Sequence, residues 1–344
     1  MTDRLGEDLG AGPIDGPASV VSGLNEISGL GPRSPSRPRL WVGIAANAGA
    51  GRGKSRIRVQ RLIQALAREG IQSRVAWTVH ERQSLVVESS RDRHCRCLVA
   101  VGGDGTVASL INERPGVPIT VLPSGTENLF ARYYRLGQDP EALARTITVG
   151  RIVCTDVGRM SGRRFGLMAG FGFDAAVVTR HHLLRLANTG VPRPTNRVAY
   201  VEPVLYSSLS YRFPRMSVTV DDLGAEETLE GTTVFVFNLP SYALGLPFVP
   251  SARGDDGWLD LIVFRKPGPL HALHYLWLVV RGLHLKRPGV EHRRVRRITI
   301  ASTESVPVQL DGDPGGILNG GAAGAWTAEV EPSAVDVLVS EAFV

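Results

Sequence analysis

The sequence predicts a chain in two parts, an α/β part with a parallel sheet followed by a mostly antiparallel β part. Its 344 residues exceed the size of one typical hydrophobic core, which favours two domains. Up to about residue 150, short apolar strands alternate with helical segments, an order that is typical of parallel sheets. Beyond residue 150, short strands follow one another with few helices between them, which is typical of antiparallel sheets.

Residues 1–38 are rich in Gly, Pro and Ser, and we expect a disordered tail there, because such a composition buries too little apolar surface to offset the entropy of ordering. The α/β domain is expected over residues 39–150. Its predicted strands are 40–46, 72–79, 98–101 and 118–122, and its predicted helices are 54–69, 83–90, 107–112 and 140–149.

The β domain is expected over residues 151–334. Its predicted strands are 151–160, 163–169, 216–220, 232–238, 259–264, 296–301 and 306–310, and its predicted helices are 196–209 and 270–283. Residues 335–339 form one more predicted strand, and the segment 335–344 could return to the first domain.

The stretch LVAVGGDGT, residues 98–106, organises the first part. Leu98–Val101 is an apolar run without alternation, as expected for a buried parallel strand. We expect Gly102 and Gly103 to adopt a backbone conformation closed to residues with a Cβ, so that another group can come very close. Asp104–Thr106 then lies where the strand gives way to a helix. In open α/β sheets ligands bind beyond the carboxyl ends of the strands, and free N–H groups at a helix start favour phosphate.

Two more loops follow strands of the same predicted sheet, at residues 47–53 and 124–128. Since carboxyl-end loops of a parallel sheet lie at one edge, the three loops would surround a nucleotide phosphate chain. The hydroxyl groups of Thr106, Ser124 and Thr126 would contribute to this site together with backbone N–H groups. The pattern is neither a Walker loop nor a dinucleotide-binding fingerprint, because GxxxxGK[ST] and a GxGxxG directly after a strand are both absent.

The net charge of +6 comes almost entirely from arginine, which prefers planar anionic partners such as phosphate. No helix-turn-helix, RNP or zinc-finger pattern is present, so we expect no nucleic-acid partner. The three cysteines are too few for a disulfide framework and lack zinc-ligand spacing, which favours a reducing cytoplasm. The first residues do not form a secretory signal, and no run of 18 uncharged apolar residues occurs.

Five motifs occur in the order of a known family. They are GGDGT at 102–106, LPSGTENLFAR at 122–132, GFGFDA at 170–175, DDGWLD at 255–260 and QLDGD at 309–313. From about Leu40 to the C-terminus the chain resembles the diacylglycerol kinase catalytic domain family, which includes soluble bacterial diacylglycerol kinases and sphingosine and ceramide kinases. The resemblance implies a doubly wound α/β nucleotide domain, an antiparallel β-sandwich and an active site in the cleft between them.

The resemblance implies an ATP-dependent lipid kinase that uses Mg²⁺ and phosphorylates a free hydroxyl of diacylglycerol or of a sphingoid-type lipid. The nucleotide contacts it implies are Asn47, Arg52, Gly102, Gly103, Asp104, Gly105, Thr106, Ser124, Gly125, Thr126 and Asn128. The implied catalytic base is Asp311, and the implied metal-binding residues are Asp104, Asp313, Asp256 and the carbonyl group of Trp258.

Three departures from the family pattern are visible. Leu129 replaces an acid in the GTxND motif, and Asp313 replaces the glutamate of DGE. Arg253 stands where an acid can help to hold a second, structural Mg²⁺ through Asp256 and Trp258, which argues against that metal.

Two rival functions are a soluble kinase of the NAD kinase type and a non-catalytic lipid-binding protein on the same fold. The late DGD motif and the helix after GTEN count against the first. The joint retention of the loop residues and Asp311 counts against the second. As a lipid kinase the protein would be cytoplasmic with peripheral, salt-sensitive contact to an anionic membrane surface, and a homodimer is left open. The apolar stretch 270–285 is interpreted as a buried helix rather than an interfacial one.

Overall fold

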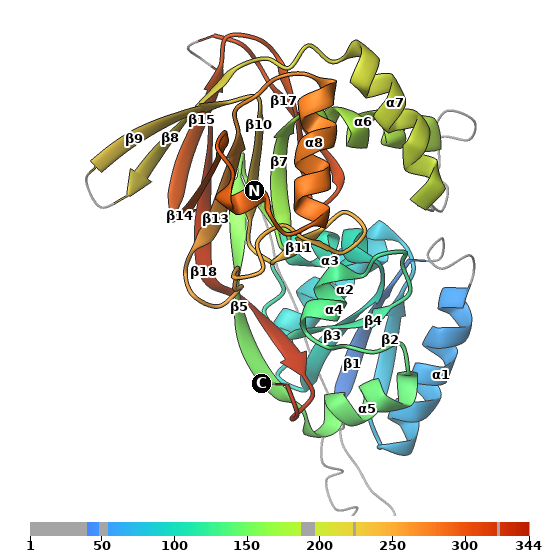
Figure 1. Cartoon of the computed structure of the whole chain (residues 1–344). Helices are drawn as coiled ribbons and strands as arrows, with labels where there is room; N and C mark the ends of the chain where they lie inside the picture. Colours follow the sequence, from blue (N-terminus) through green and yellow to red (C-terminus); the bar gives the residue numbers. More distant parts are fainter. Residues whose placement is uncertain (1–39, 48–53, 187–196, 223–224, 322–323, 344) are drawn as a thin grey trace, which may run out of the picture. The chain divides into compact units, whose positions relative to one another are not determined.

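Four parallel strands form one half of the larger sheet (Figure 1). They are β1 (Trp41–Ala46), β2 (Gln72–Ala76), β3 (Cys95–Gly102) and β4 (Ile119–Pro123), in the order β2-β1-β3-β4. The structure, a computed structural model, describes residues 40–47, 54–186, 197–222, 225–321 and 324–343, all within the unit Pro38–Val344. The predicted tail 1–38 and most of the predicted loop 47–53, including Arg52, lie outside these residues.

Helices cover both faces of these strands. Alternate residues of β1 are divided between two cores. Val42 and Ile44 pack with α1 (Lys54–Arg68) and α5 (Pro140–Val149), whereas Ala45 shares a core with α2 (Val79–Arg91) and α3 (Asp104–Asn112). Because consecutive strand residues point to opposite faces, this division means that β1 is buried on both sides. The doubly wound α/β arrangement is confirmed.

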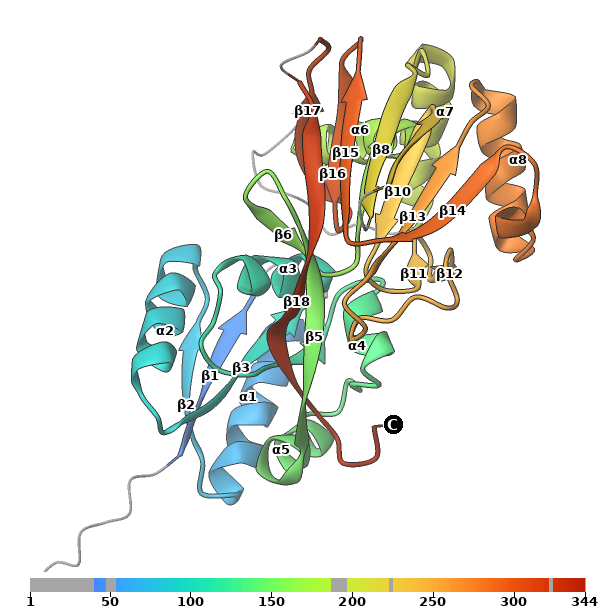
Figure 2. The ribbon, with the colours of Figure 1, turned by 90° about the vertical axis from the view of Figure 1, so that its left-hand side faces the viewer.

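A 14-residue strand, β18 (Trp326–Val339), carries the same sheet into the second part of the chain (Figure 2). Near its end β18 pairs in parallel with β4, at Val337, and along most of its length it pairs antiparallel with β5 (Arg151–Met160). Its first residues, 326–329, pair with β15 (Arg297–Ser302), after which follow β8 (Met216–Asp222) and β9 (Ala225–Gly231). The strand predicted over 335–339 is therefore the last third of a longer strand.

The second sheet is antiparallel throughout and packs on the β15–β8 side of the first. Its order is β14 (Val290–Val295), β13 (Leu259–Phe264), β10 (Thr233–Phe237), β7 (Met168–Gly172), β16 (Val306–Leu310) and β17 (Asp313–Leu318). Val218 and Ile300 of the first sheet share a fully buried core with Val236, Leu261 and Val308 of the second. This two-sheet core confirms the β-sandwich.

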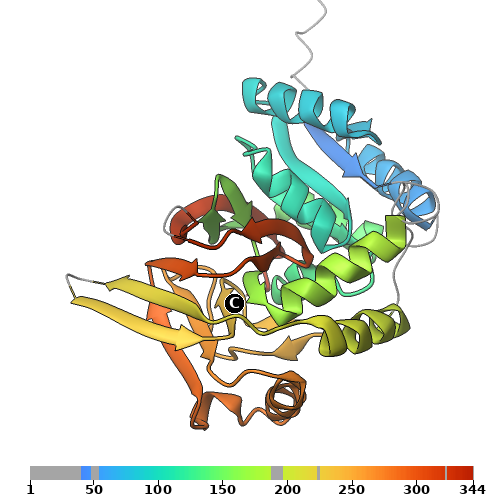
Figure 3. The same cartoon turned by 90° about the horizontal axis from the view of Figure 1, so that it is seen from above.

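The remaining elements lie around the sandwich and beside the α/β part. They are α4 (Leu129–Tyr133), β6 (Arg163–Phe165), α6 (Phe173–Leu186), the 3₁₀ turn Arg197–Tyr200, α7 (Val201–Ser210), β11 (Ser241–Tyr242), β12 (Leu246–Pro247), α8 (Pro269–Val280) and the 3₁₀ turn His284–Lys286. Helix α6 lies beside α7 (Figure 3) and was not predicted from the sequence. The strand predicted over 163–169 was wrong, because two strands, β6 and β7, occupy that region. Within the described ranges, none of the helices has the length and apolarity needed to span a bilayer.

Candidate active site

The carboxyl ends of β1, β3 and β4 lie together at one edge of the sheet. The backbone N–H of Asn47 donates to the carbonyl of Val101 at 3.1 Å, and the N–H of Ser124 donates to the carbonyl of Gly102 at 2.8 Å. The described residues of the three predicted loops are thereby brought side by side. Of their hydroxyl side chains, those of Thr106 and Ser124 are buried and that of Thr126 is exposed.

Glycine is required here for space. Gly102 and Gly103 do not have a positive φ, and Gly103 is extended with φ −100°, so the predicted special backbone conformation was wrong. A Cβ on Gly102 would lie 2.0 Å from the Thr106 hydroxyl oxygen, and one on Gly125 would lie 2.5 Å from the Cα of Gly103. The loops after β3 and β4 therefore touch backbone to backbone, and any side chain would push them apart.

Asn128 shapes the second of these loops. Its backbone has φ 53°, and its side-chain amide makes two hydrogen bonds to Gly125, accepting from the N–H and donating to the carbonyl, both at 2.9 Å. The amide is thus engaged in holding Gly125 against the neighbouring loop. This arrangement gives Asn128 a positioning role in the predicted nucleotide site.

Asp104 is the first residue of α3 and connects the two loops to α4. Its Oδ1 atom accepts the backbone N–H of Phe130 at 3.0 Å. Burial raises the pKa of Asp104, while the N–H groups of Phe130 and Leu129 act in the opposite direction. One oxygen of the Asp104 carboxyl group is therefore held by α4, and the group lies at the start of α3 next to exposed Gly105.

Asp311 comes from the sandwich part of the chain, on the turn between β16 and β17. Its carboxylate accepts three backbone N–H groups, that of Gly166 on Oδ2 at 2.8 Å and those of Leu167 and Met168 on Oδ1 at 2.8 and 3.0 Å. Two lone pairs of Oδ1 and one of Oδ2 are therefore occupied, which leaves one acceptor position on Oδ2. Burial raises the pKa of Asp311 to about 6, and the nearby charge of Asp104 contributes to the rise.

Asp313 lies on the same side as Asp311 and faces the start of α3. Its Oδ2 atom is 3.4 Å from the position that a Cβ on Gly105 would take. The structure thus brings Asp104, Asp311 and Asp313 to one place beside the glycine loops, from two parts of the chain about 200 residues apart.

Comparisons with known proteins agree with this arrangement. Residues 42–160 match the family model of the diacylglycerol kinase catalytic domain, and residues 168–339 match that of the YegS C-terminal NAD kinase beta sandwich-like domain. The second match covers half of the chain. The chain therefore belongs to the family of this second domain and carries a diacylglycerol kinase catalytic domain before it, and it is an enzyme of the lipid kinase class.

Individual relatives are distant. The chain is 28% identical over 239 residues to a diacylglycerol kinase of Staphylococcus saprophyticus, covering 67% of this chain and 74% of that protein. It is also 28% identical over 253 residues to one of Staphylococcus carnosus, covering 71% and 79%. A crystal structure of a diacylglycerol kinase from Bacillus anthracis superposes with a TM-score of 0.63 at 18% identity, covering 90% of this chain and all of that one, which shows a shared fold.

The second metal site implied by the family does not fit this chain. The Oδ2 atom of Asp256 is 2.5 Å from a guanidinium nitrogen of Arg294, and its Oδ1 atom accepts the backbone N–H of Trp258. The indole ring of Trp258 also lies under the guanidinium groups of Arg294 and Arg296. Arg253 pairs with Asp255. An arginine charge at Asp256 repels a divalent cation and argues against a metal ion there, and the assignment of Asp256 and Trp258 as metal-binding residues stays a prediction.

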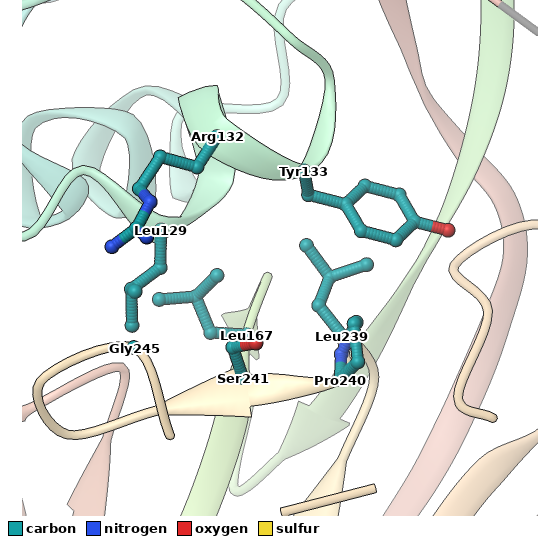
Figure 4. Close-up of a pocket in the computed structure, with 8 residues that line it drawn as sticks. All are labelled: Leu129, Arg132, Tyr133, Leu167, Leu239, Pro240, Ser241 and Gly245. Carbon is teal, nitrogen blue, oxygen red and sulfur yellow. The ribbon is translucent and has the colours of Figure 1, made fainter. Parts of the chain in front are cut away.

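A cavity of about 160 Å³ opens between α4 and the β11–β12 hairpin (Figure 4). Leu129, Leu167 and Leu239 point into it, and Arg132 lies beside Gly245. The departure from the family at Leu129 therefore adds an apolar side chain to this cavity. Leu167 connects this cavity to Asp311, because its side chain lines the cavity and its backbone N–H donates to the carboxylate.

Another carboxyl group near the site, that of Asp174, was missed from the sequence. Oδ2 of Asp174, at the start of α6, accepts the hydroxyl of Tyr242 at 3.2 Å and the side-chain amide of Gln309 at 3.1 Å. The carbonyl oxygen of the Gln309 amide accepts the N–H of Gly312 at 2.8 Å, directly after Asp311. Burial raises the pKa of Asp174 to about 6. Asp174 stands in the GFGFDA motif, but no feature of the sequence indicates that Tyr242 and Gln309 are its partners.

Proposed function

We propose that the protein transfers the γ-phosphate of ATP to the free hydroxyl group of a lipid alcohol, a diacylglycerol or a sphingoid-type lipid. The observation that carries this proposal is the meeting of Asp104 and Asp311, from the two sides of the cleft, beside the touching glycine loops of β3 and β4. The N–H groups at the start of α3 and the exposed hydroxyl of Thr126 would bind the phosphate chain of the nucleotide.

Asp311 would act as the base in this reaction. The lipid oxygen forms the new bond to the γ-phosphorus, the bond from that phosphorus to the ADP oxygen breaks, and the hydroxyl proton passes to Oδ2 of Asp311. Oδ2 is suited to this step because only one of its acceptor positions is occupied by a backbone N–H. A pKa of about 6 leaves the carboxylate ionised at neutral pH and basic enough to accept a proton.

The residues at the loops fit Mg²⁺, because carboxylate oxygen atoms are its preferred protein ligands. Asp104 and Asp313 would hold it. In the described residues no group of three or more His, Cys, Asp or Glu side chains is arranged to bind a metal ion. A pair of carboxylates, such as those of Asp104 and Asp313, suits Mg²⁺, which commonly binds through one or two carboxylates together with phosphates and water. When bound, the ion supplies positive charge to the phosphate oxygens.

The lipid would enter the cavity of Leu129, Leu167 and Leu239, which Leu167 connects to Asp311. Its apolar walls suit the glycerol-proximal part of acyl chains, and Arg132 supplies a positive charge at the rim. This places the apolar part of the substrate against α4 and the hydroxyl group towards Asp311.

The test is transfer of radiolabelled phosphate from ATP to dioctanoylglycerol, sphingosine, ceramide and NAD, with products separated by thin-layer chromatography. We expect a labelled lipid with the wild-type protein and none with Asp104→Asn, since this change keeps the oxygen that accepts the Phe130 N–H and removes the charge. Asp221→Asn, the same change at an exposed site on β8, is the control and should be fully active. Label in NAD alone would favour the NAD kinase alternative. Absence of any labelled product would favour a binding protein.

A further inference from the structure

Helix α8 exposes a ridge of apolar side chains. Leu270 is 80% exposed, Leu273 51%, Trp277 52% and Val280 58%. Their spacing of three and four residues places them on one face of the helix. Exposed Leu276 borders this face, and exposed Leu283 follows the end of the helix. We call these six residues the α8 ridge. The interpretation of residues 270–285 as a buried helix was therefore only half correct.

The opposite face of α8 is firmly packed. Tyr275, Leu278 and Val279 are buried in the same core as Phe248 and Phe264. The ring centroids of Tyr275 and Phe264 are 4.5 Å apart. Because one face holds the helix on the sandwich, the exposed ridge is rigidly presented, and apolar side chains gathered in this way mark an interaction site.

The charged side chains of the segment that carries the ridge, residues 265–290, are all positive. From Arg265 to Val290 the chain contains no Asp or Glu, and Lys266, Arg281, Lys286 and Arg287 are exposed. Arg265 pairs with Glu291, whereas none of these other four cations has an acidic partner within the described part of the chain. Four cations without an acidic partner beside an apolar ridge are complementary to a lipid layer, which has anionic headgroups at its surface and an apolar interior.

Trp277 stands at the middle of the ridge. Its ring stacks on His274, with centroids 6.0 Å apart, and the Arg281 guanidinium lies 5.9 Å from its centre. An exposed tryptophan with cationic neighbours is typical of side chains at the boundary between lipid headgroups and acyl chains.

The ridge lies near the entrance of the cavity. Helix α8 packs against β12, and the β11–β12 hairpin supplies Ser241 and Gly245 to the cavity wall. Figure 1 and Figure 2 both show α8 next to this hairpin, on the sandwich part of the molecule. A surface that binds the ridge would therefore also lie close to the opening between α4 and the hairpin.

We propose that the α8 ridge docks on an anionic lipid bilayer, with its apolar side chains among the headgroups and Lys266, Arg281, Lys286 and Arg287 on the lipid phosphates. The biological reason for docking rests on the proposed lipid kinase function, since the substrate would then pass from the bilayer into the adjacent cavity. The docking itself rests on the ridge and its charges.

The experiment is flotation of the full chain with vesicles of phosphatidylcholine alone or with 40% phosphatidylglycerol, at low and high salt. Leu273→Glu places a charge on the ridge without entering the core. Val87→Glu on α2 is the matched control, because Val87 is 47% exposed and lies in the α/β part. We expect binding to anionic vesicles that weakens with salt, at least a tenfold fall in the partition coefficient for Leu273→Glu, and no change for Val87→Glu.

A second measurement locates the contact. Vesicles with brominated acyl chains should quench the tryptophan fluorescence of the wild type, and Trp277→Phe should abolish that quenching. The proposal is overturned if Leu273→Glu floats like the wild type, if binding is equal on neutral vesicles, or if Trp277→Phe leaves the quenching unchanged. It is also overturned if sedimentation shows a dimer that Leu273→Glu dissociates, because the ridge is then an interface between copies.

The enzymatic readout separates this proposal from the proposed function. Leu273→Glu should phosphorylate monomeric dioctanoylglycerol like the wild type and lose activity on long-chain diacylglycerol in vesicles. If no lipid is phosphorylated by any variant but flotation still depends on the ridge, the kinase proposal fails and the docking proposal stands.

Discussion

Asp311→Asn is the sharpest test of the catalytic base, and the structure indicates that this change should also lower the free energy of unfolding. Asparagine keeps one acceptor oxygen, whereas the carboxylate of Asp311 accepts N–H groups on both oxygens. If the amide oxygen takes the two N–H groups of Leu167 and Met168, its NH₂ group faces the N–H of Gly166. The lost hydrogen bond and the unpaired donor should lower the free energy of unfolding by about 1–3 kcal/mol. Asparagine therefore does not preserve the hydrogen bonding of this turn.

The kinetic effect should be larger than the effect on stability. Asparagine cannot accept the hydroxyl proton, so kcat for lipid phosphorylation should fall by about 10²- to 10⁴-fold. The affinity for ATP should change little, because the nucleotide loops belong to the other part of the chain. The assay combines initial rates on dioctanoylglycerol, ATP titration by calorimetry and urea unfolding, with Asp221→Asn as control.

Two results would refute this reasoning. A folded Asp311→Asn protein with wild-type kcat would place the base elsewhere, and Asp313 is then the next candidate. A loss of ATP affinity as large as the loss of kcat, in a protein that unfolds at the wild-type urea concentration, would make Asp311 a nucleotide-binding residue.

Three further changes have defined outcomes. Gly125→Ala puts a methyl group 2.5 Å from the Cα of Gly103, so the loops must separate, and calorimetry should show weaker ATP binding; unchanged affinity would contradict the loop packing. Asp174→Asn keeps an oxygen for both hydrogen bonds of Asp174. Because burial raises the pKa of Asp174 from 3.8 to about 6, wild-type stability is lost as pH rises from about 4 to 6. The variant should therefore be more stable by up to about 3 kcal/mol at pH 8 and equal at pH 4 by urea unfolding, and a constant difference would exclude this cause. Chelation of Mg²⁺ without nucleotide should leave Tm unchanged, because an arginine holds Asp256; a fall in Tm would restore the second metal site.

Local signals predicted several elements well. Helix α5 has the predicted bounds 140–149, because Asp139 caps its first turn, Pro140 fits the first helical position and Gly150 follows its end. The break between β6 and β7 could not be predicted. It falls at Gly166 and Leu167, whose N–H groups turn to Asp311, a residue about 145 positions further on. No property of residues 163–169 shows where that partner is.

The candidate site shows the same limit. The three loops at the strand ends could be placed together, because parallel strands bring their carboxyl ends to one edge. The contact of Gly125 with Gly103 and the link from Asp174 through Gln309 to the turn after Asp311 depend on tertiary packing. Whether the predicted site residues act on ATP and lipid stays a prediction.

The buried side chain of Asp156 holds a bend in β18 between the sandwich and the α/β part. The ladder between β5 and β18 changes register between Glu331 and Val335, at the passage from the sandwich to the α/β part, and Ser333 there has φ 50°. Asp156, 2% exposed, accepts the N–H of Ser333 at 2.7 Å and that of Gly257 at 2.6 Å. Such a bulge bends a strand, and the carboxylate holds this one in place. Both strands run through the two parts, so this bend lies between the part that carries Asp104 and the part that carries Asp311. The DDGWLD turn supplies Gly257 to this contact, and on the same turn the guanidinium group of Arg294 pairs with Asp256.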